Sequence, residues 1–178
     1  MSIQTDPMVS ITDALRKIVS PMGVRNVLTG WPDPTYTSVE SNQPVLYVTL
    51  VTERGHWAAS AETVHATVPN PDGVTATVYR EKMRKVYQLR LSLFTATADE
   101  LKTLGWQIEE FLIANPRLVL GNSDVETAMF RSQWQSESPT DPAVNQRDMM
   151  FEVTARVLDV STAYLLKNLS LQSDPSTL

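Results

Sequence analysis

Residues 85–116 read KVYQLRLSLFTATADELKTLGWQIEEFLIANP and contain two periodicities in succession. The first half alternates apolar and polar side chains, which predicts a half-buried strand with Tyr87, Leu89, Leu91 and Leu93 on its buried face. In the second half, Thr97 and Glu100 form a capping box, and an apolar stripe at helical spacing follows until Asn115 and Pro116. We therefore expect a strand that leads directly into an amphipathic helix at the centre of the fold.

Upstream of this centre, the sequence predicts a first helix, a loop and a buried strand. The helix runs from Ser10 to Ser20, because Ser10 with Asp13 resembles a capping box and Pro21 and Gly23 follow the last apolar turn. Residues 24–28 fit a short strand, and the two prolines of residues 30–36 predict a surface loop. The β-branched and aromatic run 45–51 predicts a buried strand.

Residues 53–80 have the composition of a β-hairpin arm. Small and β-branched side chains alternate on both sides of the turn sequence Pro69-Asn70-Pro71-Asp72-Gly73. Two strands with few large side chains do not form a core of their own. We therefore expect the arm to lie on its own domain or on a neighbouring molecule.

Downstream, two alternating runs predict strands at about 127–135 and 148–157, joined by a loop over 136–142. The expected fold class is a two-layer α+β domain with a mixed or mostly antiparallel sheet flanked by two helices. The predicted domain spans 1–166 and carries the arm, and 167–178 form a polar tail.

Composition narrows the classes of function. The 178 residues are 42% hydrophobic and 20% charged, which is the composition of a globular protein. Zero Cys and two His exclude disulfides and thiolate metal sites and disfavour zinc, copper and haem chemistry. A net charge of −5 argues against stable nucleic-acid binding, and neither a secretory signal nor a membrane span is recognisable.

The sequence contains only weak candidates for catalytic residues. His56 and His65 could meet Glu53 and Glu62 in a metal site, but solvated histidines in a polar hairpin explain the pattern better. The pair Asp99-Glu100 suits a helix first turn, and the pair Glu109-Glu110 is expected on the polar face of the same helix. No hydrolase elbow or phosphate-binding glycine loop occurs. We expect no enzyme activity, no catalytic residue, no cofactor and no metal.

Charge and exposed aromatic residues point instead to interfaces. Residues 80–90 carry +4, which leaves −9 on the rest of the chain, and such asymmetry favours either an acidic partner surface or head-to-tail self-association. A merely solvated strand entrance explains the run equally well. Pattern places Trp106 and Trp134 in the core and leaves the other two tryptophans on loops. The candidate interface residues are Trp31, Trp57, His65, Arg80, Lys82, Arg84 and Lys85.

The order of elements resembles that of the tail terminator (neck) proteins of tailed bacteriophages. The resemblance covers about residues 10–160 and rests on the order of the elements. These are the first helix, the strand 45–51, the Ala/Thr/Val arm, the strand 85–91 with its helix 98–114, and late strands ending in RDMMFEV at 147–153. It implies a virion protein, made in the host cytoplasm, that forms a hexameric ring. That ring would cap the tail tube, and its partners would be the tube protein, a neck or head-completion protein and the sheath protein.

Two other readings of the sequence remain open. One is another virion joint protein, such as a head-completion, tail-tube or sheath-associated protein, which ring size and neighbours would separate from a terminator. The other is a small hydrolase or ligand-binding domain, which would have one deep pocket with convergent polar groups.

Overall fold

The computed structural model describes residues 6–57, 63–120, 126–137 and 145–165. Seven strands form one sheet in the order β1-β2-β4-β7-β6-β5, with β3 also paired to β4. Only the β1–β2 pair is parallel, so the predicted α+β class with a mostly antiparallel mixed sheet is confirmed. The elements in chain order are α1 Pro7–Val19, η1 Ser20–Met22, β1 Asn26–Thr29, α2 Pro34–Thr37, η2 Glu40–Asn42, β2 Val45–Trp57, β3 Thr63–Pro69, β4 Thr75–Thr95, α3 Ala98–Ala114, β5 Arg117–Val119, β6 Thr127–Glu137 and β7 Asn145–Tyr164.

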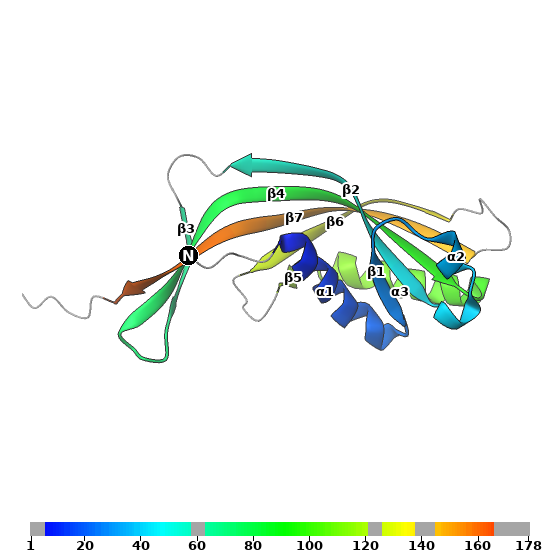
Figure 1. Ribbon diagram of the computed structural model, residues 1–178, viewed down its shortest axis with the longest axis horizontal. Helices are drawn as coiled ribbons and strands as arrows, with labels where there is room; N and C mark the ends of the chain where they lie inside the picture. The colour runs from blue at the N-terminus through cyan, green and yellow to red at the C-terminus, as the bar shows by residue number, and fades with distance from the viewer. Residues whose placement is uncertain (1–5, 58–62, 121–125, 138–144, 166–178) are drawn as a thin grey trace, which may run out of the picture.

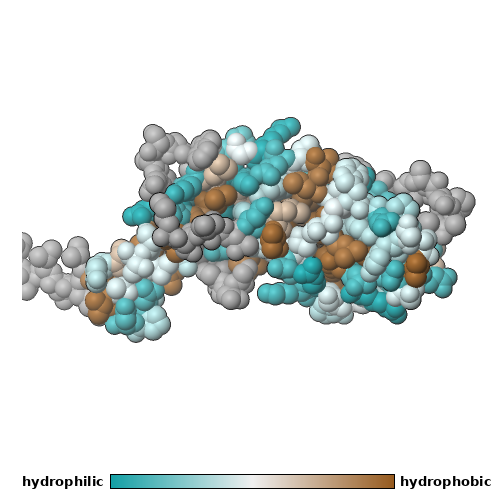
Figure 2. Space-filling model, in the orientation of Figure 1, coloured by the Kyte–Doolittle hydropathy of each residue, from teal (hydrophilic) through white to brown (hydrophobic). Residues whose placement is uncertain are grey.

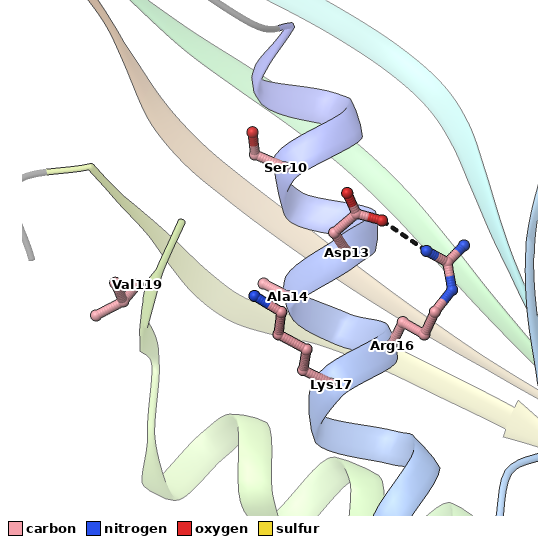
Figure 3. Close-up of a pocket in the computed structure, with 6 residues that line it drawn as sticks. All are labelled: Ser10, Asp13, Ala14, Arg16, Lys17 and Val119. Carbon is pink, nitrogen blue, oxygen red and sulfur yellow. Dashed lines mark hydrogen bonds and ion pairs between the residues drawn. The ribbon is translucent and has the colours of Figure 1, made fainter. Parts of the chain in front are cut away.

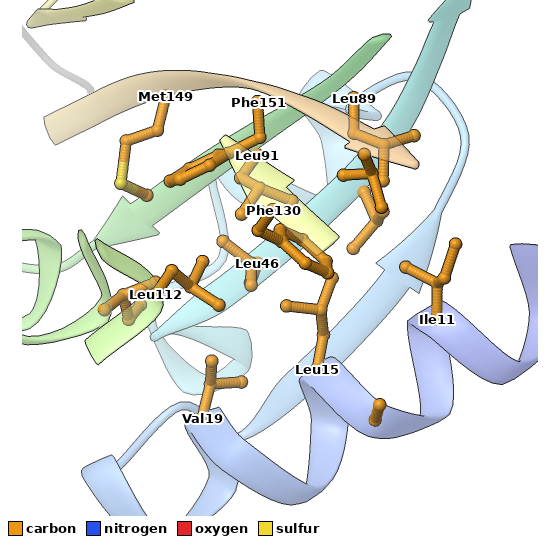
Figure 4. Close-up of a cluster of buried hydrophobic side chains, with 14 of the residues drawn as sticks. Ile11, Leu15, Val19, Leu46, Leu89, Leu91, Leu112, Phe130, Met149 and Phe151 are labelled. Atoms are coloured by element: carbon orange, nitrogen blue, oxygen red, sulfur yellow. The ribbon is translucent and has the colours of Figure 1, made fainter. Parts of the chain in front are cut away.

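Helices α1 and α3 lie on the same face of the sheet, which we call the helical face (Figure 1). The alternating residues of β4 from Tyr87 to Leu93 are fully buried on this face, as the period of two predicts. Figure 4 shows the α1 side chains Ile11, Leu15 and Val19 pointing toward the sheet. Their partners include Leu46, Leu91, Phe130 and Phe151, so one apolar cluster holds the two layers together.

The opposite face, which we call the outer face, carries a smaller apolar cluster. Val45, Tyr47 and Phe94 are buried there, and Tyr47 and Phe94 meet edge to face at 6.0 Å. Part of the predicted proline loop covers this cluster, since residues 34–37 form the one-turn helix α2. The surface loop predicted over 30–36 thus ends in a helical turn that was not predicted, because a proline suits the first position of a helix.

Helix α1 begins earlier than predicted. Asp6 is its N-cap and accepts a hydrogen bond from the Met8 amide at 3.0 Å, and Pro7 occupies the first helical position. Ser10 therefore lies inside the helix. Asp13 pairs with Arg16 at 2.6 Å instead of taking part in a capping box.

The position of this cap can be tested with two substitutions. Asp6→Ala is expected to lower the free energy of unfolding by about 0.5–2 kcal/mol, because it leaves a helix N-terminal amide without its acceptor. Ser10→Ala is the matched control and is expected to have no measurable effect on urea-induced unfolding. A larger loss from Ser10→Ala than from Asp6→Ala would contradict the observed cap.

Strand β4 is one element of 21 residues, although the sequence suggests a separate arm strand and core strand. On one side it pairs first with β3 and then with β2, and Trp57 lies opposite Met83. On the other side β7 follows it along its length, from Thr95 opposite Asn145 to Thr75 opposite Tyr164. The predicted strand 148–157 is thus too short, since β7 extends from 145 to 164.

This pairing makes the projecting part of the sheet three-stranded. From here on, the arm means β3, the turn 70–74, residues 75–82 of β4 and residues 158–164 of β7, in place of the predicted 53–80. Figure 1 shows it extending away from the helices. A register shift between Glu81 and Met83 marks its base. At its tip, Asp72 accepts hydrogen bonds from the Thr75 hydroxyl and from the Thr75 and Val74 amides, and these bonds hold the pKa of Asp72 below its usual value. The predicted tail at 167–178 lies outside the described residues.

Candidate interaction surfaces

Strand alternation divides the basic run 80–90 between the two faces of the sheet. Lys85 lies on the helical face, 2.6 Å from the Glu53 carboxylate and 5.9 Å from the centre of the Tyr87 ring. Lys82 lies at the register shift and pairs with Asp159 at 3.2 Å. The run therefore does not form one patch, because successive strand residues point to opposite sides.

Two further candidates lie in or beside the arm. Arg80 donates a hydrogen bond to Ser161 at 3.0 Å, which links β4 to β7 within the arm. His65 lies at a second register shift, between Val64 and Ala66 of β3.

Beside Lys85, burial raises the pKa of Tyr87, and the negative charges of Asp6 and Glu53 act in the same direction. The Tyr87 phenol is therefore neutral at neutral pH.

The tryptophans are distributed differently from the prediction. Trp31 is 67% exposed, as its loop position suggests, and the guanidinium of Arg90 lies 4.6 Å from its ring centre. Trp106 is 60% exposed, so its predicted place in the core was wrong. It shares an outward stripe of α3 with Ile113, which is also exposed. The side chains of Trp57 and Trp134 lie outside the described part of the structure.

Glu109 departs from its predicted solvated position. Its carboxylate lies 2.9 Å from the Arg147 guanidinium, and both residues are buried. Gly105 makes this contact sterically possible, because a Cβ atom there would lie 2.6 Å from the Cδ atom of Arg147. The side chain of Arg147 thus crosses α3 over a glycine to reach its partner one turn further along.

Five arginines gather on the outer face where the body meets the arm. One row of paired residues crosses five strands from Arg54 through Val86, Thr154 and Met129 to Arg117. Paired residues of neighbouring strands share a face, and so do the rows two residues away, which contain the Arg84–Arg156 pair and Arg131. We call this set the arginine face; its members are Arg54, Arg84, Arg117, Arg131 and Arg156.

The centre of the arginine face is an unusual pair of like charges. Arg84 and Arg156 lie directly opposite each other on β4 and β7. Like charges in this arrangement repel each other, and one carboxylate compensates them both. Glu81 accepts from Arg84 at 3.0 Å and from Arg156 at 2.9 Å. Sequence reasoning found only Arg84, because the other four arginines meet it through strand register.

An open groove of about 520 Å³ adjoins this pair. It is lined by His65, Arg84, Arg117, Thr127, Met129, Thr154 and Arg156. The lining is cationic and includes two hydroxyl groups, which is suited to anionic oxygen atoms. The part of the lining that the structure describes contains no carboxylate or thiol that could act as a nucleophile or general base.

The helical layer has two smaller candidate sites. Figure 3 shows the first, about 220 Å³ between α1 and β5, where Asp13 is bonded to Arg16 and Lys17 is the other charged group. The second, about 580 Å³, lies between η1 and the end of α3 beside Phe111. Ser10 also lines the first site, but among the described residues its hydroxyl makes no hydrogen bond to Asp13 or Lys17, and the described lining of the second has one ionisable group, Glu110. Among the described residues, no cluster of His, Asp or Glu could hold a metal ion.

The arm exposes apolar side chains on a part of the molecule remote from the core cluster. Val64, Val68 and Val74 are 52%, 40% and 55% exposed, and Tyr164 is 82% exposed. Figure 2 shows hydrophobic residues on the surface of both the arm and the body. The outer backbone edges of β3 and of the end of β7 have no strand partner among the described residues. No described helix is long and apolar enough to cross a membrane.

Solved structures that resemble this chain include two of low sequence identity. No protein-family model and no curated protein matches the chain. A chain from the virion of a native gene transfer agent particle is 16% identical, with a TM-score of 0.38 over 85% of this chain and 93% of that one. A chain from the sheath/tube terminator of an extracellular contractile injection system in its extended state is 10% identical, with a TM-score of 0.43. That match covers all of this chain and 64% of the other.

Proposed function

We propose that this protein is a structural subunit of a phage-tail-like particle, a tail terminator that forms a closed ring on the end of the tail tube. In this role it acts as a joint between the tube and the neck or head, and it carries out no catalysis. A ring of six is expected from the resemblance of its layout to terminator proteins. Its place in the assembled virion would be the end of the tail.

The arm is the observation that carries this proposal. It extends β3, β4 and β7 beyond the helices, it exposes three valines and a tyrosine, and it contributes no residue to the main apolar cluster. Apolar side chains and open strand edges outside a core are typical of surfaces that a partner covers. The arm and the body are different surfaces, so contacts between them are heterologous, and heterologous contacts that close produce a ring.

The proposal is tested on assembled particles and on the purified protein. Native mass spectrometry at tens of micromolar is expected to give a closed oligomer, and electron microscopy of the particle is expected to place it at the tube end. A protein that is monomeric in solution and forms no ring in the particle would contradict the proposal. Turnover of any substrate that is lost in a His56→Ala or His65→Ala variant would contradict its non-enzymatic role.

A further inference from the structure

We propose that the arginine face binds carboxylates of a second copy of this chain, supplied by the end of the body that lies farthest from the arm. This inference rests on the proposed self-association and identifies the two surfaces that are in contact. Guanidinium groups of one copy pair there with aspartate and glutamate side chains of the next.

Three guanidinium groups of the arginine face have no partner among the residues that the structure describes. Arg54, Arg117 and Arg131 are exposed, and within the described residues they make no hydrogen bond or ion pair. Arg84 and Arg156 already show what the surface binds, since they share the carboxylate of Glu81. A planar guanidinium matches a carboxylate with two parallel hydrogen bonds, so arginines are suited to this role.

The charge distribution of the chain indicates that a second copy binds to the arginine face. The five arginines with Glu81 and Glu152 on the same face sum to +3, which leaves −8 on the remainder of a chain whose net charge is −5. The remaining surface of a second copy is therefore acidic and complementary to this face. The same negative total disfavours nucleic acid as the ligand, because phosphates would be repelled by the rest of the molecule.

The far end of the body supplies suitable carboxylates. Helices α2 and η2 precede the start of β2, and α3 follows the end of β4, so they gather at one end (Figure 1). Asp33, Glu40 and Asp99 are exposed there and Glu100 is half-buried. We call these four residues the acidic end. It and the arginine face are distinct surfaces of one chain, so their pairing is head to tail and can repeat around a ring.

Charge reversal with rescue tests the inference. Arg117→Glu with Arg131→Glu is expected to weaken self-association by roughly tenfold or more, because like charges then face each other across the contact. Glu40→Lys with Asp99→Lys is expected to weaken it similarly. An equimolar mixture of the two variants is expected to associate better than either alone, because both kinds of mixed contact again join opposite charges. Association is measured by analytical ultracentrifugation at low and high salt, and salt weakens the parent contact.

The control is Arg16→Glu with Lys17→Glu, which changes the net charge equally on the exposed side of α1 and is expected to leave assembly unchanged. Thermal unfolding establishes that every variant is folded. Rings that form equally in the Arg117 and Arg131 variant would overturn this inference and leave the proposed function intact, whereas a monomeric parent would contradict the proposed function itself. DNA binding by the parent that disappears in the reversed variant would assign the face to nucleic acid and overturn the inference.

Discussion

A variant without the arm is expected to remain folded and to lose ring formation completely. The register specifies how to make it: Trp57 lies opposite Met83, so residues 58–82 can be replaced by Asn-Gly to close a β2–β4 hairpin, and the chain can end at Val157. The main apolar cluster contains no residue from the removed segments. Its thermal midpoint is therefore expected to stay close to that of the parent, while native mass spectrometry gives a monomer that does not cap tail tubes.

A milder variant removes the apolar surface of the arm but keeps its strands, so that the two effects can be measured separately. Val64→Thr, Val68→Thr and Val74→Thr keep all strands of the arm and make its exposed side chains polar. At roughly 25 cal/mol per Å² of apolar surface covered, this change should weaken assembly without abolishing it. Normal rings from the armless protein would show that the arm serves another surface. An armless chain that does not fold would show that the arm belongs to the folding unit.

Glu109→Ala is expected to be the most destabilising of the single substitutions considered. It removes one partner of a buried ion pair and leaves the charge of Arg147 without its carboxylate, which costs about 3–5 kcal/mol of unfolding free energy. Urea-induced unfolding followed by circular dichroism measures the loss. Glu110→Ala is the matched control, since its side chain is exposed, and is expected to change stability by less than about 0.5 kcal/mol.

The pair itself contributes less than the single substitution suggests. Replacing both partners, with Glu109→Leu and Arg147→Met, is expected to recover most of the stability, because two apolar side chains avoid the cost of burying charge. Gly105→Ala is expected to destabilise by steric means, because the new methyl group would overlap the Arg147 side chain. Equal effects of Glu109→Ala and Glu110→Ala would contradict the buried position of Glu109.

Sequence patterns predicted the helices and strands whose formation depends on neighbouring residues alone. The capping box at Thr97 gave the helix with nearly its observed bounds, and the alternation from Tyr87 to Leu93 gave the C-terminal half of β4, because one face of each is buried. The start of α1 was missed because Asp6 and Pro7 precede the apolar periodicity. Strand β5 has three residues, too few for a pattern.

The surfaces were less accessible to sequence reasoning, because they depend on register and packing. The arginine face draws one residue from each of five strands, and only the pairing partners bring them together. Glu109 was expected in solvent because its partner Arg147 lies 38 positions further along the chain. Trp106 was expected inside because it adjoins the apolar stripe of α3, yet it points outward. The distinction between terminator and other joint proteins stays a prediction.

The shared length of β4 and β7 has a mechanical consequence. The two strands stay paired from the tip of the arm, at Thr75 and Tyr164, to the far end of the body, at Thr95 and Asn145, with one register shift between Glu81 and Met83. Interstrand hydrogen bonds are perpendicular to the strands, so tension applied along the arm loads the ladder in shear and is distributed over many bonds at once. In the proposed role at the end of a tail, these two strands would carry tension directly from the arm to the far end of the body.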